Sequence, residues 1–179
     1  MIGEIHDLET ADIAINASLT GHLVFSALDT NDAPSAIARL LDIGVKPFLV
    51  ASSIRGIMAQ RLVRSICETC REEYVPEKSE LSLLGNASQQ VKSVTMYRGT
   101  GCSQCGMSGY RGRIGIFEIL VLNDEIWQMI FEDVSSTELR NKARQLGMRT
   151  LREDGIRKVI GGQTTVEEVL RVSARDLGL

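Results

Sequence analysis

Four cysteines are the residues of this chain whose types and spacing best define a chemistry. They form two Cys-x-x-Cys pairs, Cys67 with Cys70 and Cys102 with Cys105. A tight turn within each pair can point both sulfurs at one ion, and Zn²⁺ binds four thiolates in a tetrahedron at about 2.3 Å. The interval between the pairs is long for such a site. Because loop closure costs only about 0.6 kcal/mol more per doubling of length, we still predict one shared structural zinc site.

Closed coordination by four thiolates leaves no position for a substrate, so the site should stabilise the local fold rather than catalyse a reaction. An iron–sulfur cluster and buried free thiols are the alternatives. No secretory signal opens the chain, and its longest apolar runs, residues 22–28 and 114–122, are far shorter than a membrane span of roughly 20 residues. We therefore expect a cytoplasmic chain, whose thiols stay reduced rather than forming disulfides.

Composition limits the class of protein and of partner. A chain of 179 residues with 44% hydrophobic content can bury a core as one domain or two small ones. The net charge of −3 and the 4% aromatic content disfavour a nucleic-acid partner. Arginines nevertheless gather near the cysteine pairs with few acids among them: Arg55, Arg61, Arg64, Arg71, Arg98, Arg111 and Arg113. A solvated face is the favoured interpretation of these arginines, and a docking surface is the alternative.

Two expected strands position the cysteines, because residues 61–66 lead directly into Cys67 and residues 113–122 follow the second pair. Between the pairs, the pattern predicts two minor elements, a short helix in residues 77–90 and a weak strand in residues 91–97. Before the cysteines, apolar runs at residues 1–5 and 22–28 alternate with helical segments. This alternation favours a parallel sheet that is covered on both faces.

Helices are expected where a capping side chain precedes an apolar periodic pattern. Asp7 caps a first helix. Residues 31–34 begin a second, with a capping side chain and Pro34 in its first turn, and Pro47 opens a third that runs to about Gln60. From Asn123 onward the pattern is helical, with capping boxes that begin at Ser135, Thr150 and Thr164. These signals predict a small helical bundle at the C-terminal end.

Glu4 and His22 are the candidate catalytic residues. Glu4 lies at the carboxyl end of an expected buried strand, where an open α/β sheet places carboxylates that face nucleotides or metal-bound water. An acidic first helical turn explains Asp7 and Glu9 well but Glu4 poorly. His22 begins the next strand, and a lone histidine is more often a packed or capping residue than a catalyst. A phosphate-binding P-loop is absent from these 179 residues, because no lysine follows a glycine.

Several segments together resemble one family. They are residues 2–11, 19–31, 59–64, 109–118 and 148–155, with the tetracysteine insert. They are similar to the C-terminal part of the type II secretion and type IV pilus assembly ATPases. The resemblance implies hexameric motors with a RecA-like core that use ATP and Mg²⁺. It also implies that Glu4 corresponds to the Walker B acid, His22 to the first histidine of the His box, and the four cysteines to a zinc subdomain.

The fold class expected from this resemblance is α/β. A partial RecA-like (P-loop NTPase) core would occupy residues 1–66, a tetracysteine zinc insert residues 67–112, and a returning strand with a C-terminal helical bundle residues 113–179. The family usually has arginine where this chain has His6, and histidine where it has Asp29. Both departures, and the missing Walker A loop, predict that this chain alone does not hydrolyse ATP.

The expected function is that of a C-terminal fragment of a hexameric ATPase that powers type II secretion or type IV pilus assembly. Its partners would be further copies of itself and an inner-membrane platform protein. It would lie in the cytoplasm at the inner-membrane face, peripheral to the membrane and without a span of its own. The alternative is a zinc-stabilised interaction module, an adaptor or decayed paralogue, that docks the platform protein.

Overall fold

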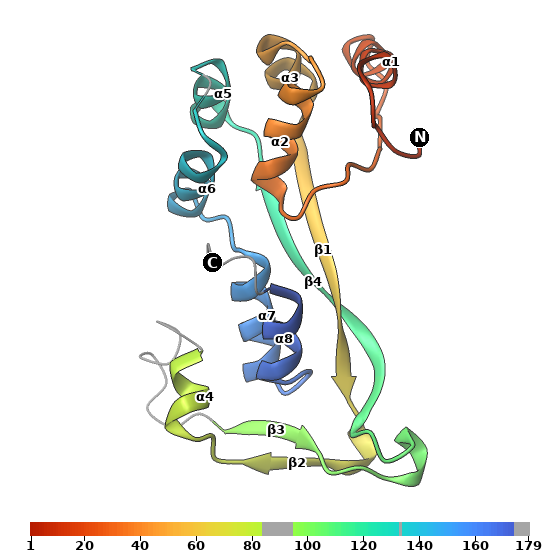
Figure 1. The fold of residues 1–179 in the computed structure, drawn as a ribbon, viewed down its shortest axis with the longest axis vertical. Coiled ribbons are helices and arrows are strands. Elements are labelled where there is room, and N and C mark those ends of the chain that lie inside the picture. The colour runs from red at the N-terminus through yellow and green to blue at the C-terminus, as the bar shows by residue number, and fades with distance from the viewer. Residues whose placement is uncertain (84–94, 133, 174–179) are drawn as a thin grey trace. The chain divides into compact units, whose positions relative to one another are not determined.

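The computed structural model describes residues 1–83, 95–132 and 134–173 (Figure 1). The chain separates into two compact units. Unit 1 contains Met1–Ala59 and Glu118–Met148, and unit 2 contains Gln60–Phe117 and Arg149–Leu179. Two long strands, β1 (Gly56–Ile66) and β4 (Tyr110–Val121), pair with each other and contribute residues to both units. The three-part division expected from the sequence stays a prediction.

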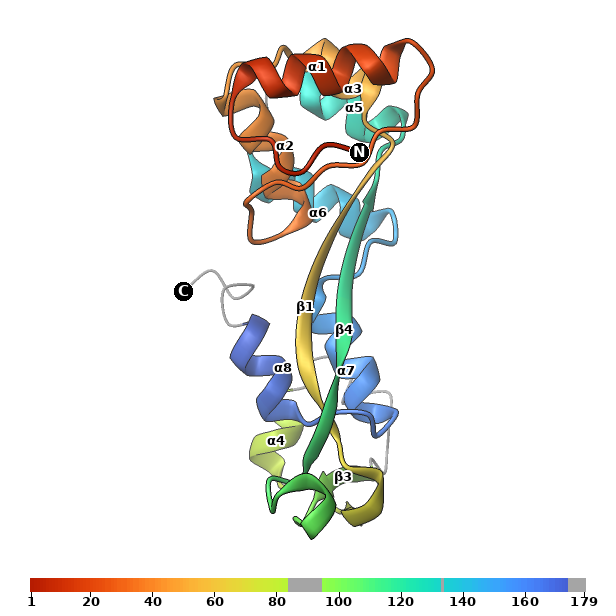
Figure 2. The same ribbon diagram turned by 90° about the vertical axis from the view of Figure 1, so that its right-hand side faces the viewer.

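Unit 1 begins with a parallel pair of extended segments joined by helix α1 (Leu8–Leu19), which Figure 2 shows from the side. Glu4 and Ala27 form the parallel bridge, and the N–H of Ile5 donates to the carbonyl of Ala27 at 3.0 Å. The predicted parallel pairing is therefore present. Cover on both faces is not, because within this chain Leu23 and Phe25 remain 79% and 63% exposed.

Four more helices complete unit 1: α2 (Ala33–Asp42), α3 (Pro47–Ser53), α5 (Asp124–Phe131) and α6 (Ser136–Gln145). Their apolar faces share one core, to which Val50, Leu120 and Ile126 contribute. Helix α3 ends earlier than expected, since strand β1 already begins at Gly56. Alternate residues of β1, including Ile57 and Ala59, pack on this core. From Gly56 onward the apolar side chains therefore follow the two-residue period of a strand, not the helical period expected as far as Gln60.

Unit 2 combines a small sheet with helices. Strand β2 (Arg71–Tyr74) pairs antiparallel with β3 (Met96–Gly99). The helices are α4 (Lys78–Leu83), α7 (Leu151–Ile160) and α8 (Val166–Ser173), and Met96 packs among the apolar residues of α7 and α8. The rest of the helix expected in residues 77–90 and most of the strand expected in residues 91–97 lie outside the described residues.

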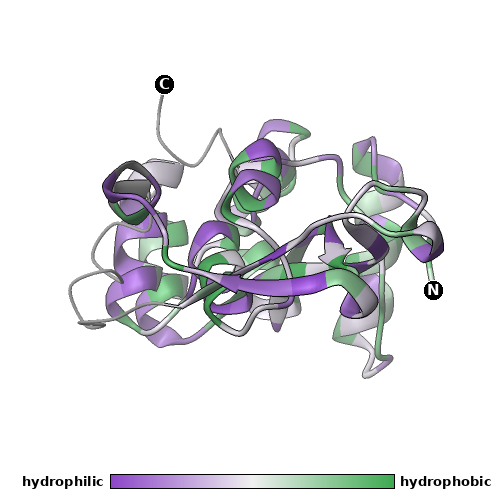
Figure 3. Ribbon diagram, turned by 90° about the horizontal axis from the view of Figure 1, so that it is seen from below, coloured by the Kyte–Doolittle hydropathy of each residue, from purple (hydrophilic) through white to green (hydrophobic). Residues whose placement is uncertain are grey.

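The single helical bundle expected at the C-terminal end is not confirmed. Helices α5 and α6 pack in unit 1, whereas α7 and α8 pack against each other in unit 2. All four are amphipathic. Figure 3 shows hydrophilic and hydrophobic residues alternating along the helical ribbons of the chain. The pattern therefore identified the helices, but not the partners against which they pack.

Candidate metal centre

The two cysteine pairs lie on matching turns in unit 2. Cys67 precedes a short 3₁₀ turn that ends at Cys70, Glu68–Cys70, and Cys102 precedes a second one that ends at Cys105, Ser103–Cys105. The backbone joins the two turns directly, because the N–H of Cys67 donates to the carbonyl of Gly109 at 2.9 Å. A second link runs from the N–H of Thr100 to the carbonyl of Cys70 at 3.0 Å. Local turns and these cross-links bring the four sulfurs together.

The sulfur positions match one tetrahedral ion. All four Sγ atoms lie within 4.8 Å of one another. The separations are 3.9 Å for Cys67 to Cys102, 3.9 Å for Cys70 to Cys105 and 3.7 Å for Cys102 to Cys105. A tetrahedron with bonds of about 2.3 Å requires sulfur separations of about 3.8 Å, so the four residues fit a single metal ion. A multi-iron cluster needs its thiolates further apart, because they surround several metal atoms.

Backbone donors favour the thiolate form at one end of the cluster. The N–H of Cys102, 3.2 Å from the Cys105 sulfur, and the N–H of Gly109, at 3.3 Å, lower the pKa of Cys105 to about 6. Burial and hydrogen bonds with the other thiols raise the pKa of Cys70 to about 11. A bound ion would displace the protons that the thiols still carry, because zinc binds thiolates.

A close approach of two glycines holds the second turn against strand β3. A Cβ at Gly99 would lie 2.0 Å from the carbonyl oxygen of Gly109, and a Cβ at Gly109 would lie 2.5 Å from that of Gly99. Gly109 also has φ near +77°, which disfavours other residues. Neither position therefore accepts a side chain without movement of the backbone.

Gly99→Ala is expected to destabilise unit 2 by about 1–3 kcal/mol, because the methyl group must push β3 away from the Gly109 backbone. The shift would also weaken metal affinity. Chemical unfolding and a metal-competition titration measure the two effects. Gly161→Ala is the control, since a Cβ there meets only ordinary contacts, at 3.4 and 3.7 Å. Equal stability of the two variants would show that the glycine contact is not tight.

The two candidate catalytic residues, Glu4 and His22, both lie in unit 1, before and after helix α1. Glu4 precedes α1, and its Oε2 lies 3.1 Å from Nε2 of His6. His22 follows α1, with Nδ1 3.2 Å from the hydroxyl oxygen of Thr20. The twelve residues of α1 rise by about 18 Å, so these two positions stand at opposite ends of the helix. Asp29 is closer to Glu4 than His22 is along the strand, because it follows Ala27, the bridge partner of Glu4, by two residues.

Sequence reasoning missed a buried polar cluster in the same unit. Glu118 is only 1% exposed, and its Oε1 accepts the N–H of Ala33 at 2.8 Å. Asp32, at 7% exposure, accepts a 2.5 Å hydrogen bond from Arg140. The sequence carries one signal for this cluster, since Glu118 stands between Ile116 and Leu120 on the alternation that points into the core.

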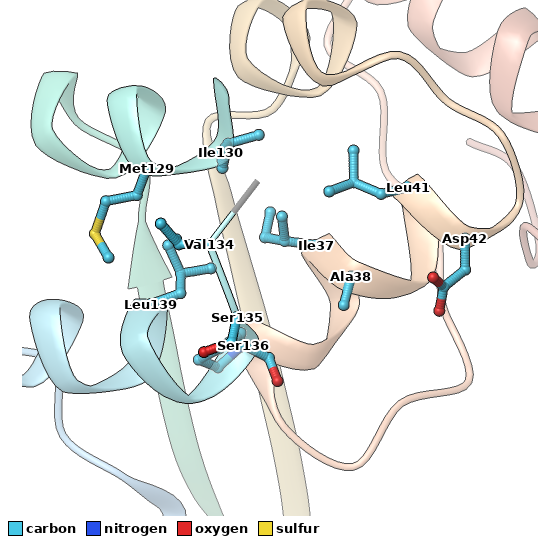
Figure 4. A pocket seen from close by; sticks show the side chains of 11 residues that line it. Ile37, Ala38, Leu41, Asp42, Met129, Ile130, Val134, Ser135, Ser136 and Leu139 are labelled. Atoms are coloured by element: carbon cyan, nitrogen blue, oxygen red, sulfur yellow. The ribbon is translucent and has the colours of Figure 1, made fainter. Parts of the chain in front are cut away.

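A cavity of about 220 Å³ lies between α2, α5 and α6 of unit 1 (Figure 4). Ile37, Ile130 and Leu139 supply apolar wall, Ser135 and Ser136 supply polar wall, and Asp42 is the one charged residue among the described residues that line it. This lining offers no acid–base pair for catalysis. Throughout residues 1–83, 95–132 and 134–173, no helix has the length and apolar character needed to cross a membrane.

Comparison with known proteins identifies relatives over almost the whole chain. Residues 1–171 match the family described as type II/IV secretion system protein. The type IV pilus assembly ATPase PilB of Thermus thermophilus is 49% identical over 170 residues, which cover 95% of this chain and 19% of that protein. The type II secretion system protein E of Pseudomonas aeruginosa is 49% identical over 176 residues, 98% of this chain and 34% of that protein. The chain thus spans about a fifth to a third of these relatives.

Solved structures share the α/β fold of this chain. The crystal structure of the pilus retraction motor PilT with bound ADP superposes with a TM-score of 0.64 at 24% identity. It covers 99% of this chain and 40% of the PilT chain. The Legionella pneumophila ATPase DotB superposes with a TM-score of 0.60 at 19% identity, over 97% of this chain and 38% of DotB. At these identities the likeness concerns the fold alone.

Proposed function

Because this chain belongs to the type II/IV secretion system protein family, we propose that it forms the C-terminal part of an ATPase motor for type II secretion or type IV pilus assembly. The family match over residues 1–171 carries this proposal. Relatives named for both systems are equally similar, at 49% identity, so the proposal covers both. The α/β ATPase fold shared with PilT is consistent with it.

In this proposal the chain supplies part of a RecA-like core. Glu4 would act as the Walker B acid that orders Mg²⁺ or the attacking water, and His22 would belong to the His box. The phosphate-binding loop would come from sequence outside these 179 residues, because none of their lysines follows a glycine. Further copies would complete a hexamer at the cytoplasmic face of the inner membrane, where a platform protein receives the motion.

The four cysteines would hold a structural Zn²⁺. Tetrahedral geometry and an all-sulfur donor set are what zinc prefers in closed sites. The ion would fasten the two turns to each other and would take no part in ATP hydrolysis. The alternative function, a zinc-stabilised adaptor without a motor, has no observation in its favour.

A chimera tests the proposed motor role. The region of the Pseudomonas aeruginosa type II secretion system protein E that matches this chain would be replaced by the 179 residues, and ATP hydrolysis measured. We expect hydrolysis by the chimera, and a fall in kcat of about 10²-fold or more in Glu4→Gln, the range associated with loss of a positioned carboxylate. Glu9→Gln is the control, because Glu9 is an exposed acid in the first turn of α1.

His6 and Asp29 supply a second arm of the same experiment. His6 pairs with Glu4 at 3.1 Å, and it stands where the family usually has arginine. His6→Arg and Asp29→His in the chimera should raise kcat, because both changes restore the residues that the family usually has. A chimera that stays inert after both reversions, or one whose Glu4→Gln variant hydrolyses ATP as fast as the parent, would contradict the proposed function.

A further inference from the structure

Unit 1 contains a buried pair of carboxylates that the proposed mechanism does not use. Both act on the first turn of α2, although they come from distant parts of the sequence. Oε1 of Glu118, on β4, accepts the N–H of Ala33 at 2.8 Å. Oδ1 of Asp32, the N-cap residue, accepts the N–H of Ser35 at 2.9 Å. The N-terminus of α2 thus receives one local and one long-range anionic cap, and both interact favourably with the helix dipole.

Arginine from α6 completes the cluster. The Nη2 of Arg140 donates to Oδ2 of Asp32 at 2.5 Å, and the side chains of Arg140 and Asp32 are 26% and 10% exposed. Burial of a carboxylate is costly unless it is paired and hydrogen-bonded, and both conditions are met for Asp32. Side chains from strand β4 and helix α6 therefore hydrogen-bond to two adjacent residues at the start of α2, Asp32 and Ala33.

These hydrogen bonds hold one end of the segment of residues 28–31, which begins beside Glu4. Residues 28–31 connect Ala27 to the start of α2. At one end, Ala27 forms a parallel bridge with Glu4, and the N–H of Ala27 donates to the carbonyl of Gly3 at 3.2 Å. At the other end, Asp32 and Ala33 are held by Arg140 and Glu118. Both ends of the segment are therefore held in place. Asp29 belongs to this segment and follows Ala27, the residue paired with Glu4, by two positions.

We propose that Glu118 and Arg140 are positioning residues, which hold residues 28–31 beside Glu4 in the geometry that ATP hydrolysis requires. The inference rests on the proposed function. A parallel α/β sheet places its ligands at the carboxyl ends of the strands, where Glu4 and this segment meet. Displacing such a segment by about 1 Å can cost as much as 10²-fold in rate. Glu118 would act through the segment and would not touch the nucleotide.

The chimera described above separates positioning from simple stability. Glu118→Gln keeps the shape and an acceptor oxygen but removes the charge, and Arg140→Gln removes the grip on Asp32. Both variants should lower kcat by about 10-fold to 10²-fold and leave KM for ATP within about twofold, because the phosphate loop lies elsewhere. Asn123→Ala is the matched control, since it removes the N-cap of α5 in the same unit, a 3.0 Å hydrogen bond to Ile126.

Asn123→Ala should lower the melting temperature to a similar extent without changing kcat. The positioning role would be overturned if kcat fell as far in Asn123→Ala as in Glu118→Gln. It would also be overturned if kcat were unchanged in Glu118→Gln. Hydrogen exchange of the 179-residue chain supplies a readout that needs no activity. Glu118→Gln should accelerate amide exchange in residues 28–33, and Asn123→Ala should not.

The two proposals can fail separately. If the chimera stays inert even with His6→Arg and Asp29→His, the proposed function fails, and the exchange measurement alone decides whether Glu118 holds the segment. If the chimera is active and Glu118→Gln changes neither kcat nor exchange in residues 28–33, the proposed function stands and the positioning role is wrong.

Discussion

Cys105→Ser is expected to abolish tight zinc binding and to unfold the two cysteine turns of unit 2. A structural zinc site contributes an apparent binding free energy of about 10–16 kcal/mol near neutral pH, and loss of one of four thiolates removes the closed tetrahedron. Cys105 is the most informative position, because its sulfur accepts the N–H groups of both Cys102 and Gly109. A serine hydroxyl would keep part of these hydrogen bonds and lose the metal ligand.

Elemental analysis of freshly purified protein should find about one zinc ion per chain in the parent and almost none in Cys105→Ser. Ser103→Ala is the matched control, because Ser103 lies in the same turn but offers no ligand to the cluster. Hydrogen exchange should show loss of protection in the cysteine turns and in β2 and β3, with unit 1 unchanged. Zinc far below one equivalent in the parent protein would contradict the assignment.

Acid should release the ion, since thiolates must be protonated for the metal to leave. Chelation at neutral pH should have the same effect on unit 2 as Cys105→Ser, and re-addition of Zn²⁺ should reverse it. A chelated protein that keeps full protection in the cysteine turns would show that backbone hydrogen bonds alone support them.

Signals that depend only on nearby residues could be predicted from the sequence. The N-caps at Asp7 and Asn123 are confirmed, as are the capping boxes at Ser135 and Thr150. The helix start expected at residues 31–34 is also confirmed, with Asp32 as its N-cap. A cap is a contact over about three residues, so its spacing is visible in the chain. The box expected at Thr164 is wrong, because its hydroxyl donates to the carbonyl of Arg64 at 2.8 Å and α8 begins at Val166.

Contacts between distant residues could not be predicted in the same way. Glu118 and Ala33 are 85 residues apart, and no local pattern records that they meet. The cysteine cluster is the exception, because metal chemistry itself specifies which residues must converge. The close approach of Gly99 and Gly109 could not be predicted either, because they are ten residues apart and only the fold brings their backbones together. Which helices would share a core also depended on the tertiary fold.

Glu168→Gln is expected to destabilise unit 2 by about 2–3 kcal/mol at neutral pH. Glu168 is fully buried, and both of its carboxylate oxygens accept hydrogen bonds. Oε2 accepts the backbone N–H of Arg64 at 2.8 Å, and Oε1 accepts that residue's guanidinium at 2.7 Å. The guanidinium of Arg171 adds contacts of 3.2 and 3.0 Å. A glutamine would place an amide donor against one of these donors, at the cost of an unpaired buried group.

The pH dependence distinguishes this carboxylate from an ordinary surface acid. Burial would raise the pKa of Glu168, but the donors from Arg64 and Arg171 outweigh it and lower the pKa from 4.5 to about 2. Because the folded-state pKa lies below the unfolded one, the stabilisation is fully present above about pH 4.5 and is lost as the pH falls through about 2. The shift corresponds to about 3 kcal/mol, which partial exposure of both arginines reduces.

Glu167→Gln is the matched control, because Glu167 is the exposed neighbour of Glu168 in the first turn of α8. Chemical unfolding of the parent and both variants at pH 7 and pH 3 gives the test. The difference between Glu168→Gln and Glu167→Gln should fall to less than half at pH 3, and comparing variants at one pH cancels the metal release that acid causes in all of them. A difference that does not change with pH would show that packing, rather than the charge of Glu168, stabilises the contact between β1 and α8.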